Sequence, residues 1–329
     1  MIPRFVKRGG GSSAPLVFKP MLKNRPWHER HFNFILLLPA LLVIVFLTVY
    51  PLINVLRLSL YEYNYLRGVP KFVGLDNYWR LFSDKFFADG IKNTFLFSIS
   101  ATVIEVLLGL GLAVLFNRRF RSRRLLLPLV IFPMMLSTMV VCSIWRSMYH
   151  YDYGILNHIL ENLTPTVNWL RGVLGLSPLD SLRVRWLFDP DLALWSVVLV
   201  DIWQWTPMAF LILLAGLQSI PKELYEAARV DGATGIGLFR WVTLPLLKNH
   251  LFLALLLRSI DTFKIFDKVY ALTGGGPGSA TETISFYIYR EGFKYFNMGR
   301  ASAAAVIMFL AVGAISVVYI RQVLGRGRD

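Results

Sequence analysis

Residues 218–248 read QSIPKELYEAARVDGATGIGLFRWVTLPLLK and separate two long apolar stretches of the chain. Pro221 suits the first position of a helix, because its ring fixes a helical backbone angle where no N–H is needed. The residues that follow can be helical, and Gly232 is a natural stop. The segment is therefore predicted to form a short helix. Its adjacent Ala227 and Ala228 are small enough to let another surface approach closely.

Apolar stretches long enough to cross a membrane recur along the chain, in which 55% of residues are hydrophobic and 17% are charged. About 20 apolar residues in a helix cross a hydrocarbon core of about 30 Å. Lipid cannot satisfy backbone polar groups, so such stretches must be helices. We predict an all-α membrane protein with six transmembrane helices, at residues 34–60, 91–116, 125–148, 192–217, 249–272 and 301–320. A soluble architecture is excluded.

The first stretch is too long for the apolar core of a signal peptide, and no small-residue cleavage site follows it. We therefore expect it to be retained. The domain organisation predicted is an N-terminal arm at residues 1–31, a transmembrane domain at residues 32–322 and a tail at residues 323–329. The arm is rich in glycine and serine and is expected to be disordered.

The net charge of +15 is unevenly placed along the chain. Basic residues concentrate in residues 4–30, 118–124 and 321–328, which fall on one side of an even-numbered topology. The positive-inside rule makes that side cytoplasmic, so both termini and residues 218–248 are predicted to lie in the cytoplasm. Orientation and contact with anionic lipid explain the basic excess without a nucleic-acid partner.

No pattern typical of catalysis is present. Cys142 is the only cysteine, and the five histidines do not show the spacing of metal ligands. The glycines at residues 274–278 lack the Lys-Ser/Thr ending of a phosphate-binding loop and suit an external turn. The chain is thus not expected to be an enzyme, and neither catalytic residues nor a metal site is predicted. Any energy-dependent function would therefore draw on a gradient or on another subunit.

The spacing of several motifs resembles that of permease subunits of carbohydrate ABC importers, of the maltose and glycerol-3-phosphate type. Glu226-Ala227-Ala228, Gly232 and Leu244-Pro245 match the family's cytoplasmic EAA loop, which receives force from a separate ATPase. The segments at residues 74–78, 216–221 and 272–277 match as well, so the likeness covers nearly the whole chain. An isolated Glu-Ala-Ala triplet would favour an ordinary surface helix, and the full spacing through Leu244-Pro245 reverses that interpretation.

This resemblance implies the type I ABC importer permease fold, with a core at residues 91–322 and an EAA coupling loop at residues 218–248. It implies that seven residues couple to the ATPase: Glu226, Ala227, Ala228, Asp231, Gly232, Leu244 and Pro245. Its implied partners are a second homologous permease, two cytoplasmic ATPase subunits that use ATP and Mg, and an extracytoplasmic solute-binding protein. No cofactor is expected on this chain itself. The implied location is the inner membrane of a bacterial or archaeal cell.

Charged residues inside apolar spans are costly and usually functional. By position, Asp201 and Arg258 fall near the bilayer midplane on successive spans. Helical spacing puts two sets of side chains on helix faces that could line a cavity for a sugar. The resemblance implies that the family's sugar cavity lies at these two helices. It also implies a contribution from the third span, where Ser137 and Thr138 lie. The two faces comprise Asp201, Gln204, Trp205 and Met208 on one helix, and Arg258, Asp261, Thr262 and Ile265 on the next.

Three alternatives remain open at this point. The midplane charges could form a structural pair, Asp201–Arg258 or Arg258–Asp261, that only closes the bundle. Glu105, which precedes a small-residue face at Gly109, Gly111 and Ala113, is expected to make a structural hydrogen bond to a neighbouring helix. The chain could also be an ion-coupled secondary transporter that uses Asp201, Glu105 or Asp261, although no inverted repeat is visible.

Overall fold

The computed structural model describes residues 27–118 and 120–324, with side chains for residues 36–118 and 120–322. The predictions made for residues 1–26 and 325–329, most of the arm and of the tail, lie outside the described residues. The chain divides into two compact units, residues 1–53 and 54–329, and each is described by itself.

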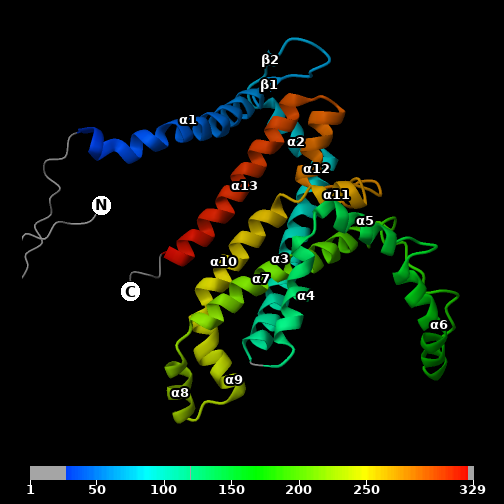
Figure 1. Ribbon diagram of the computed structural model, residues 1–329. Coiled ribbons are helices and arrows are strands. Elements are labelled where there is room, and N and C mark those ends of the chain that lie inside the picture. The colour runs from blue at the N-terminus through cyan, green and yellow to red at the C-terminus, as the bar shows by residue number, and fades with distance from the viewer. Residues whose placement is uncertain (1–26, 119, 325–329) are drawn as a thin grey trace, which may run out of the picture. The chain divides into compact units, whose positions relative to one another are not determined.

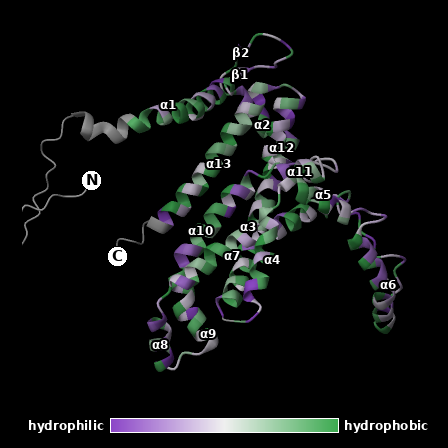
Figure 2. Ribbon diagram, viewed as in Figure 1, coloured by the Kyte–Doolittle hydropathy of each residue, from purple (hydrophilic) through white to green (hydrophobic). Residues whose placement is uncertain are grey.

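The first unit consists of most of α1 (Trp27–Leu58), a helix that contains Pro39 and Pro51. Most of its described residues are apolar, as the green ribbon of Figure 2 shows. Their side chains are largely exposed. Phe46 and Tyr50, one turn apart, stack with ring centroids 5.5 Å apart. An all-round apolar exposed helix is typical of a segment surrounded by lipid.

The second unit is almost entirely helical (Figure 1). A short antiparallel hairpin pairs β1 (Tyr61–Glu62) with β2 (Lys71–Phe72). The helices are α2 (Asp76–Phe82), α3 (Lys85–Asn117), α4 (Arg123–Met135), α5 (Thr138–Met148), α6 (Ile155–Val173), α7 (Ala193–Ser219), α8 (Lys222–Val230), α9 (Gly235–Leu238), the π-helix η1 (Phe239–Thr243), α10 (Leu244–Phe263), α11 (Asp267–Leu272), α12 (Ile284–Tyr289), the π-helix η2 (Arg290–Lys294) and α13 (Met298–Leu324).

Four helices of the described part are long and apolar enough to cross a membrane: Leu36–Leu58, Lys85–Asn117, Ala193–Ser219 and Met298–Gln322. A fifth span results if α4 and α5 are taken together. The prediction of a mostly helical membrane protein is confirmed, whereas the count among described residues is four or five instead of six.

The predicted third span, residues 125–148, is two helices bent by 98°. Leu136 and Ser137 adopt extended backbone angles, and α4 carries Pro133 in its last turn. Pro133 lacks the N–H that would bond the carbonyl four residues earlier, which weakens the last turn of α4, and the break itself follows at the extended residues Leu136 and Ser137.

The predicted fifth span, residues 249–272, is also not one helix. It begins earlier, at Leu244, and α10 ends at Phe263, three residues before α11. Lys248, Arg258 and Asp261 all fall within α10, so its composition is more polar than that of the other spans. The segment after residue 151 contains the single 19-residue helix α6, and α3 begins at Lys85, earlier than the predicted span 91–116.

The packing of α3 against α7 is the tightest helix contact of the second unit. A Cβ added at Gly109 would lie 2.8 Å from the Phe210 backbone nitrogen, so only glycine permits this approach. Ala113, one turn further along α3, is fully buried, but Gly111 faces open space. The small-residue face is therefore made by Gly109 and Ala113, as expected for close contact between membrane helices.

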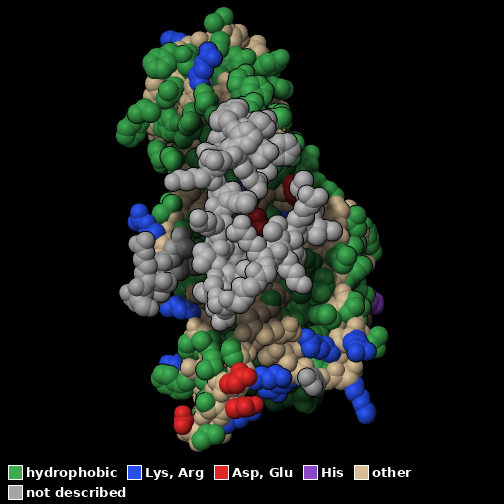
Figure 3. All heavy atoms as spheres, turned by 60° about the vertical axis from the view of Figure 1, so that its left-hand side comes forward, with side chains coloured by type: hydrophobic (Ala, Val, Ile, Leu, Met, Phe, Trp, Pro, Cys, Tyr) green, Lys and Arg blue, Asp and Glu red, His purple; other side chains and the backbone are tan. Residues whose placement is uncertain are grey.

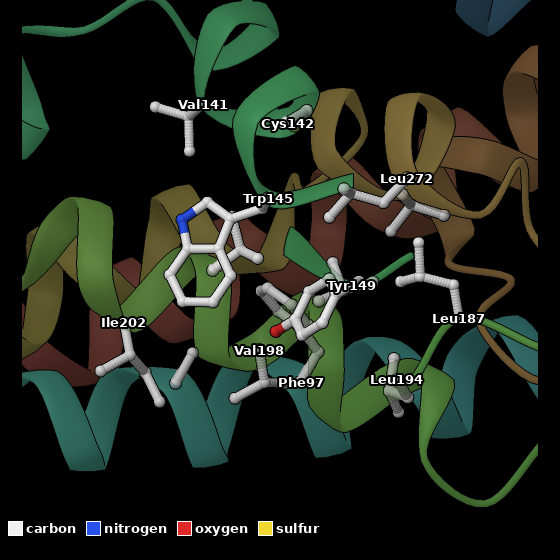
Figure 4. Close-up of a cluster of buried hydrophobic side chains, with 14 of the residues drawn as sticks. Phe97, Val141, Cys142, Trp145, Tyr149, Leu187, Leu194, Val198, Ile202 and Leu272 are labelled. Atoms are coloured by element: carbon white, nitrogen blue, oxygen red, sulfur yellow. The ribbon is translucent and has the colours of Figure 1, made fainter. Parts of the chain in front are cut away.

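Buried apolar side chains form a cluster where α5 crosses α3 and α7 (Figure 4). Trp145 and Tyr149 of α5 point toward Val198 and Ile202 of α7 in this view. The Tyr149 hydroxyl donates a hydrogen bond of 2.9 Å to the Ser196 carbonyl, which satisfies the one polar end of the ring. This cluster holds α5 at its steep angle after the break.

Candidate functional site

The loop between α7 and α10 contains the helix predicted from the sequence. Gly232 has φ +86°, and its N–H donates to the Arg229 carbonyl at 3.0 Å, while the Ala233 N–H donates to Ala228 at 2.9 Å. This pair of bonds is a Schellman motif, which ends a helix with a residue in the left-handed region. The prediction that Gly232 ends the helix is confirmed. Pro221 lies at the N-cap, one residue before the first helical position.

The residues predicted for coupling lie together on this loop. Five are exposed (Glu226, Ala227, Asp231, Gly232 and Pro245) and two are half-buried (Ala228 and Leu244). A hydrogen bond of 3.1 Å between the Tyr225 hydroxyl and Thr243 joins α8 to η1. Charged side chains, red and blue, gather at the lower end of Figure 3, where α8 and α9 lie in Figure 1.

Large apolar side chains stand exposed on the same loop: Val230, Ile236 and Trp241 are each more than 70% accessible. Such side chains beside charged ones are typical of a surface that another protein covers. The loop also lines a cavity of about 780 Å³ together with the last residues of α3 and α7. The predicted topology directs these ends of α3 and α7 toward the cytoplasm.

Four ionisable side chains from four helices meet inside the second unit, and we call them the charge network. They are Glu105 of α3, Asp201 of α7, Arg258 of α10 and Lys268 of α11, each at most 2% exposed. Arg258 donates from Nε and Nη2 to the two oxygens of Glu105, at 2.5 and 3.0 Å. Its Nη2 also donates to Asp201 Oδ2 at 2.9 Å.

Lys268 completes the charge network by donating to Asp201 Oδ1. Two carboxylates and two cations balance, and every carboxylate oxygen has a basic donor. Such pairing is what makes ionised groups tolerable away from water, since an unpaired buried charge is strongly destabilising. The two structural ion pairs considered from the sequence were Asp201–Arg258 and Arg258–Asp261, and they differ in how closely their members approach. Arg258 binds Asp201 closely, whereas Asp261 lies 3.8 Å from Arg258 and is half-exposed.

A cavity of about 290 Å³ opens above the charge network. Both cations lie near the Trp205 ring: its centroid is 5.2 Å from Arg258 Cζ and 5.9 Å from Lys268 Nζ. The residues lining the cavity are Thr138, Asp201, Trp205, Arg258, Asp261, Lys264, Ile265, Phe266, Asp267 and Lys268. Six of the predicted substrate-path residues are among them.

The other predicted substrate-path residues lie close by without lining this cavity. Gln204 is buried and donates to the Leu136 carbonyl at 3.1 Å, which bridges α7 to the break between α4 and α5. Thr262 is buried and hydrogen-bonds Ser98 and Thr102 of α3, at 2.8 and 3.1 Å. Met208 is half-buried one turn further along α7, and Ser137 is the exposed N-cap of α5.

Sequence reasoning missed Lys268 and Phe266, and it gave Glu105 too small a role. Lys268 belonged to the predicted span 249–272, so the rule that intramembrane charges are functional would have selected it. Because the helix breaks at Lys264, the residues of α11 do not continue the helical spacing of α10. The face on which Lys268 lies could therefore not be assigned from that spacing. Glu105 was expected to make one interhelical hydrogen bond and makes two to Arg258.

Comparison with known proteins gives a consistent result. The profile of one family, described as "Binding-protein-dependent transport system inner membrane component", matches residues 105–329. The trehalose/maltose transport system permease protein MalF of Thermococcus litoralis is 37% identical over 306 residues, which cover 92% of this chain and 96% of that protein.

Two further relatives are similar over most of their length. The sulfoquinovosyl glycerol transport system permease protein SmoG of Agrobacterium fabrum is 34% identical, with 89% of this chain and 90% of the relative covered. The trehalose transport system permease protein SugA of Mycobacterium tuberculosis is 33% identical, with 89% of each chain covered.

The fold is matched by a solved chain of a bacterial ABC transporter involved in the import of the acidic polysaccharide alginate. The TM-score is 0.72 at 22% identity, over 90% of this chain and 96% of that one. At that identity the likeness concerns the fold alone. It holds for the helix arrangement that carries both the loop and the charge network.

Proposed function

The chain belongs to the binding-protein-dependent transport system inner membrane components, which are non-catalytic, multi-pass permeases of ABC importers, and on this premise we propose that its cargo is a carbohydrate or a polyol. Support comes from relatives whose names specify trehalose and maltose, which are disaccharides, and sulfoquinovosyl glycerol, which is a glycoside of glycerol. The cavity above the charge network supplies the chemistry. Trp205 offers an aromatic face for a sugar ring, and half-exposed Asp261 offers a carboxylate for hydroxyl groups.

The cavity beside Trp205 and Asp261 carries the proposal of a sugar cargo, and the saturation of the charge network argues against the alternative of an ion-coupled secondary transporter. Glu105 and Asp201 already accept from Arg258 and Lys268 through all four oxygens. An ion-coupled transporter needs a carboxylate that is free to bind and release its ion, which favours the importer over the secondary transporter. Asp261 is the one predicted candidate that keeps a solvent-accessible carboxylate.

We further propose that force reaches the permease through α8. The Glu226 to Gly232 segment would dock on a cytoplasmic ATPase subunit that binds and hydrolyses ATP with Mg. A second homologous permease would complete the path, and an extracytoplasmic binding protein would deliver the sugar. Exposed Val230, Ile236 and Trp241 support docking on this loop, because apolar side chains at such density are costly to leave in water.

The test is uptake by the reconstituted complex. The chain is reconstituted in liposomes with the second permease and the ATPase, with the loaded binding protein outside and ATP inside. Labelled disaccharides and polyols should accumulate only with ATP, and collapse of ion gradients by ionophores should leave uptake intact. Uptake that persists without ATP and stops with ionophores would establish the secondary transporter instead.

The sugar-stacking role of Trp205 has its own test. Trp205→Ala should reduce apparent sugar affinity in uptake about fivefold, equivalent to roughly 1 kcal/mol for one aromatic contact. Trp205→Phe is the matched control, since it keeps an aromatic ring near Arg258 and Lys268 and should retain most of the affinity. Equal loss in both variants, with unchanged assembly, would assign Trp205 to packing.

A further inference from the structure

A second polar cavity is lined by residues that belong to other segments of the chain than the charge network. It has a volume of about 400 Å³ and is bounded by the β1–β2 hairpin, by α2 and by the first residues of α13. The hairpin follows the first predicted span, so the topology puts this cavity on the external side of the membrane. The predicted sugar path and the coupling loop include none of its lining residues.

The lining of this cavity is strongly basic. It contains four basic side chains, Arg67, Lys71, Arg80 and Arg300, and one acidic side chain, Glu62. Some of that charge is compensated. Arg80 lies 3.3 Å from Glu62 and 2.7 Å from Asp76, and Arg300 lies 3.7 Å from Asp84 and 4.0 Å from Glu291.

Arg67 and Lys71 carry the remaining positive charge. Both are exposed on the hairpin, and neither has a carboxylate of the described residues within 4.0 Å. A cavity wall with two uncompensated cations raises the local concentration of anionic groups and steers them toward it.

The cavity is held in shape by a network of side-chain amides. Asn64 donates to Asn297 Oδ1 at 2.6 Å and to the Tyr295 carbonyl at 3.0 Å, which ties the hairpin to the start of α13. Asn77 of α2 donates to the carbonyls of Ser59 and Tyr61 at 2.8 and 2.9 Å. A binding site that is already formed avoids the entropy cost of ordering on association.

The rim of the cavity is apolar and exposed. Tyr65, Leu66 and Val69 of the hairpin are 64, 70 and 92% accessible. Tyrosine and arginine together, with apolar neighbours and a polar centre, are the composition of protein interface hot spots. Because the hairpin and α2 precede the second span, a partner that reaches them comes from outside the membrane.

We propose that this cavity docks an acidic side chain, aspartate or glutamate, on the surface of the importer's extracytoplasmic binding protein. This inference rests on the proposed function, which supplies a protein partner on that side. Arg67 and Lys71 would bind the carboxylate with charge-assisted hydrogen bonds, while Tyr65, Leu66 and Val69 pack around the contact. Complementary charge of this kind contributes mainly to the rate of association and to specificity.

The test uses the full complex in nanodiscs of zwitterionic lipid. ATPase stimulation is measured against the concentration of loaded binding protein. Arg67→Glu with Lys71→Glu should raise the half-saturating concentration about tenfold, leave the maximal rate unchanged, and reduce the dependence on salt. The neutral pair Arg67→Gln with Lys71→Gln should give a smaller shift and keeps the test valid if charge reversal impairs assembly.

The matched control is Arg171→Glu with Arg185→Glu, an equal change of charge on the segment around α6, predicted to lie on the same side. An equal shift in this control, or no shift in the hairpin variants, would overturn the inference. A shift that appears only when anionic lipid is included would assign the cavity to lipid headgroups and overturn it too. Failure of the wild-type complex to respond to any binding protein would instead refute the proposed function.

Discussion

Asp201 is the residue on which the charge network depends, because it accepts from both cations. We predict that Asp201→Asn destabilises the protein by about 3–5 kcal/mol, since it leaves Lys268 buried and uncompensated. Asp201→Asn with Lys268→Met restores the balance and keeps the Arg258–Glu105 bonds, so stability should return. Asp201→Asn with Arg258→Gln should not recover, because Glu105 then loses both donors. Thermal unfolding in detergent measures all three variants.

The control for this series is Asp261→Asn. Asp261 is half-exposed and 3.8 Å from Arg258, and such a pair contributes about 0–1 kcal/mol. A destabilisation as large as that of Asp201→Asn would mean that solvent access does not decide the strength of these pairs. Recovery by the Arg258→Gln double variant would mean that Glu105 finds a partner elsewhere.

At the same scale, Glu282 gives the external side a pH dependence. It lies 1% exposed between α11 and α12, and burial, with smaller contributions from Asp84 and Asp89, raises its pKa to about 7 despite its Arg290 partner. A carboxyl whose pKa is raised on folding stabilises the fold fully below its unfolded pKa of about 4.3 and loses that contribution as pH rises through about 7.

We therefore expect the thermal stability of the protein to fall between pH 5 and pH 8, and Glu282→Gln to flatten this slope. Unfolding of the two proteins across that range is the measurement. Glu161→Gln, a change of the same kind on α6, serves as the control and should leave the wild-type slope in place. An unchanged slope in Glu282→Gln would mean that other groups produce it.

At the scale of single elements, the end of α8 offers a clean comparison between two glycines of one loop. An added Cβ meets nothing within 4 Å at either Gly232 or Gly237, but only Gly232 has a left-handed backbone, with φ +86°. Gly232→Ala should cost about 1 kcal/mol and weaken the coupling of ATP hydrolysis to uptake, whereas Gly237→Ala should be neutral.

Gly232→Pro is the stronger version of that experiment. It removes the N–H that donates to Arg229 and forbids the backbone angle, so uptake should be lost while the chain still inserts. Uptake and ATPase activity are measured together with membrane insertion. Normal uptake by Gly232→Pro would exclude the end of α8 from the coupling mechanism.

Elements also show where sequence reasoning succeeds. Periodic or continuous apolar segments predicted α3, α7 and α13 well, because lipid leaves helices as the one solution for such stretches. The helix stop at Gly232 was predicted from local backbone preference. The 98° bend between α4 and α5 was not, because Trp145 and Tyr149 hold α5 through contacts that are distant in sequence. For the same reason, the partnership of Lys268 with Asp201 could not be read from spacing.

For the whole molecule, the predicted orientation is open to direct labelling. Cysteines placed at Ser122 and at Ser181, both exposed, should react with impermeant thiol reagents from the cytoplasm and from outside, respectively, in a Cys142→Ala background. The reason is the basic segment at residues 118–124, which positive-inside placement keeps in the cytoplasm. Labelling of both cysteines from one side would require an even number of membrane crossings between them, for example none if α4 and α5 together do not cross.

The balance of the charge network also has a consequence for the order in which the chain is made. Glu105 is synthesised 153 residues before Arg258, and Asp201 is synthesised 57 before it. During that interval each acidic helix enters the bilayer without its partner, at an insertion cost of roughly 2.5–3.5 kcal/mol for a carboxylate at mid-membrane.

A nascent chain halted before α10 should therefore stay beside the translocon or be degraded, whereas one extended past Lys268 should leave it. Crosslinking of stalled chains of both lengths would reveal this; equal release would mean that the acids are neutralised by other means. Biogenesis would then depend on Arg258 and Lys268, the two cations that are synthesised last.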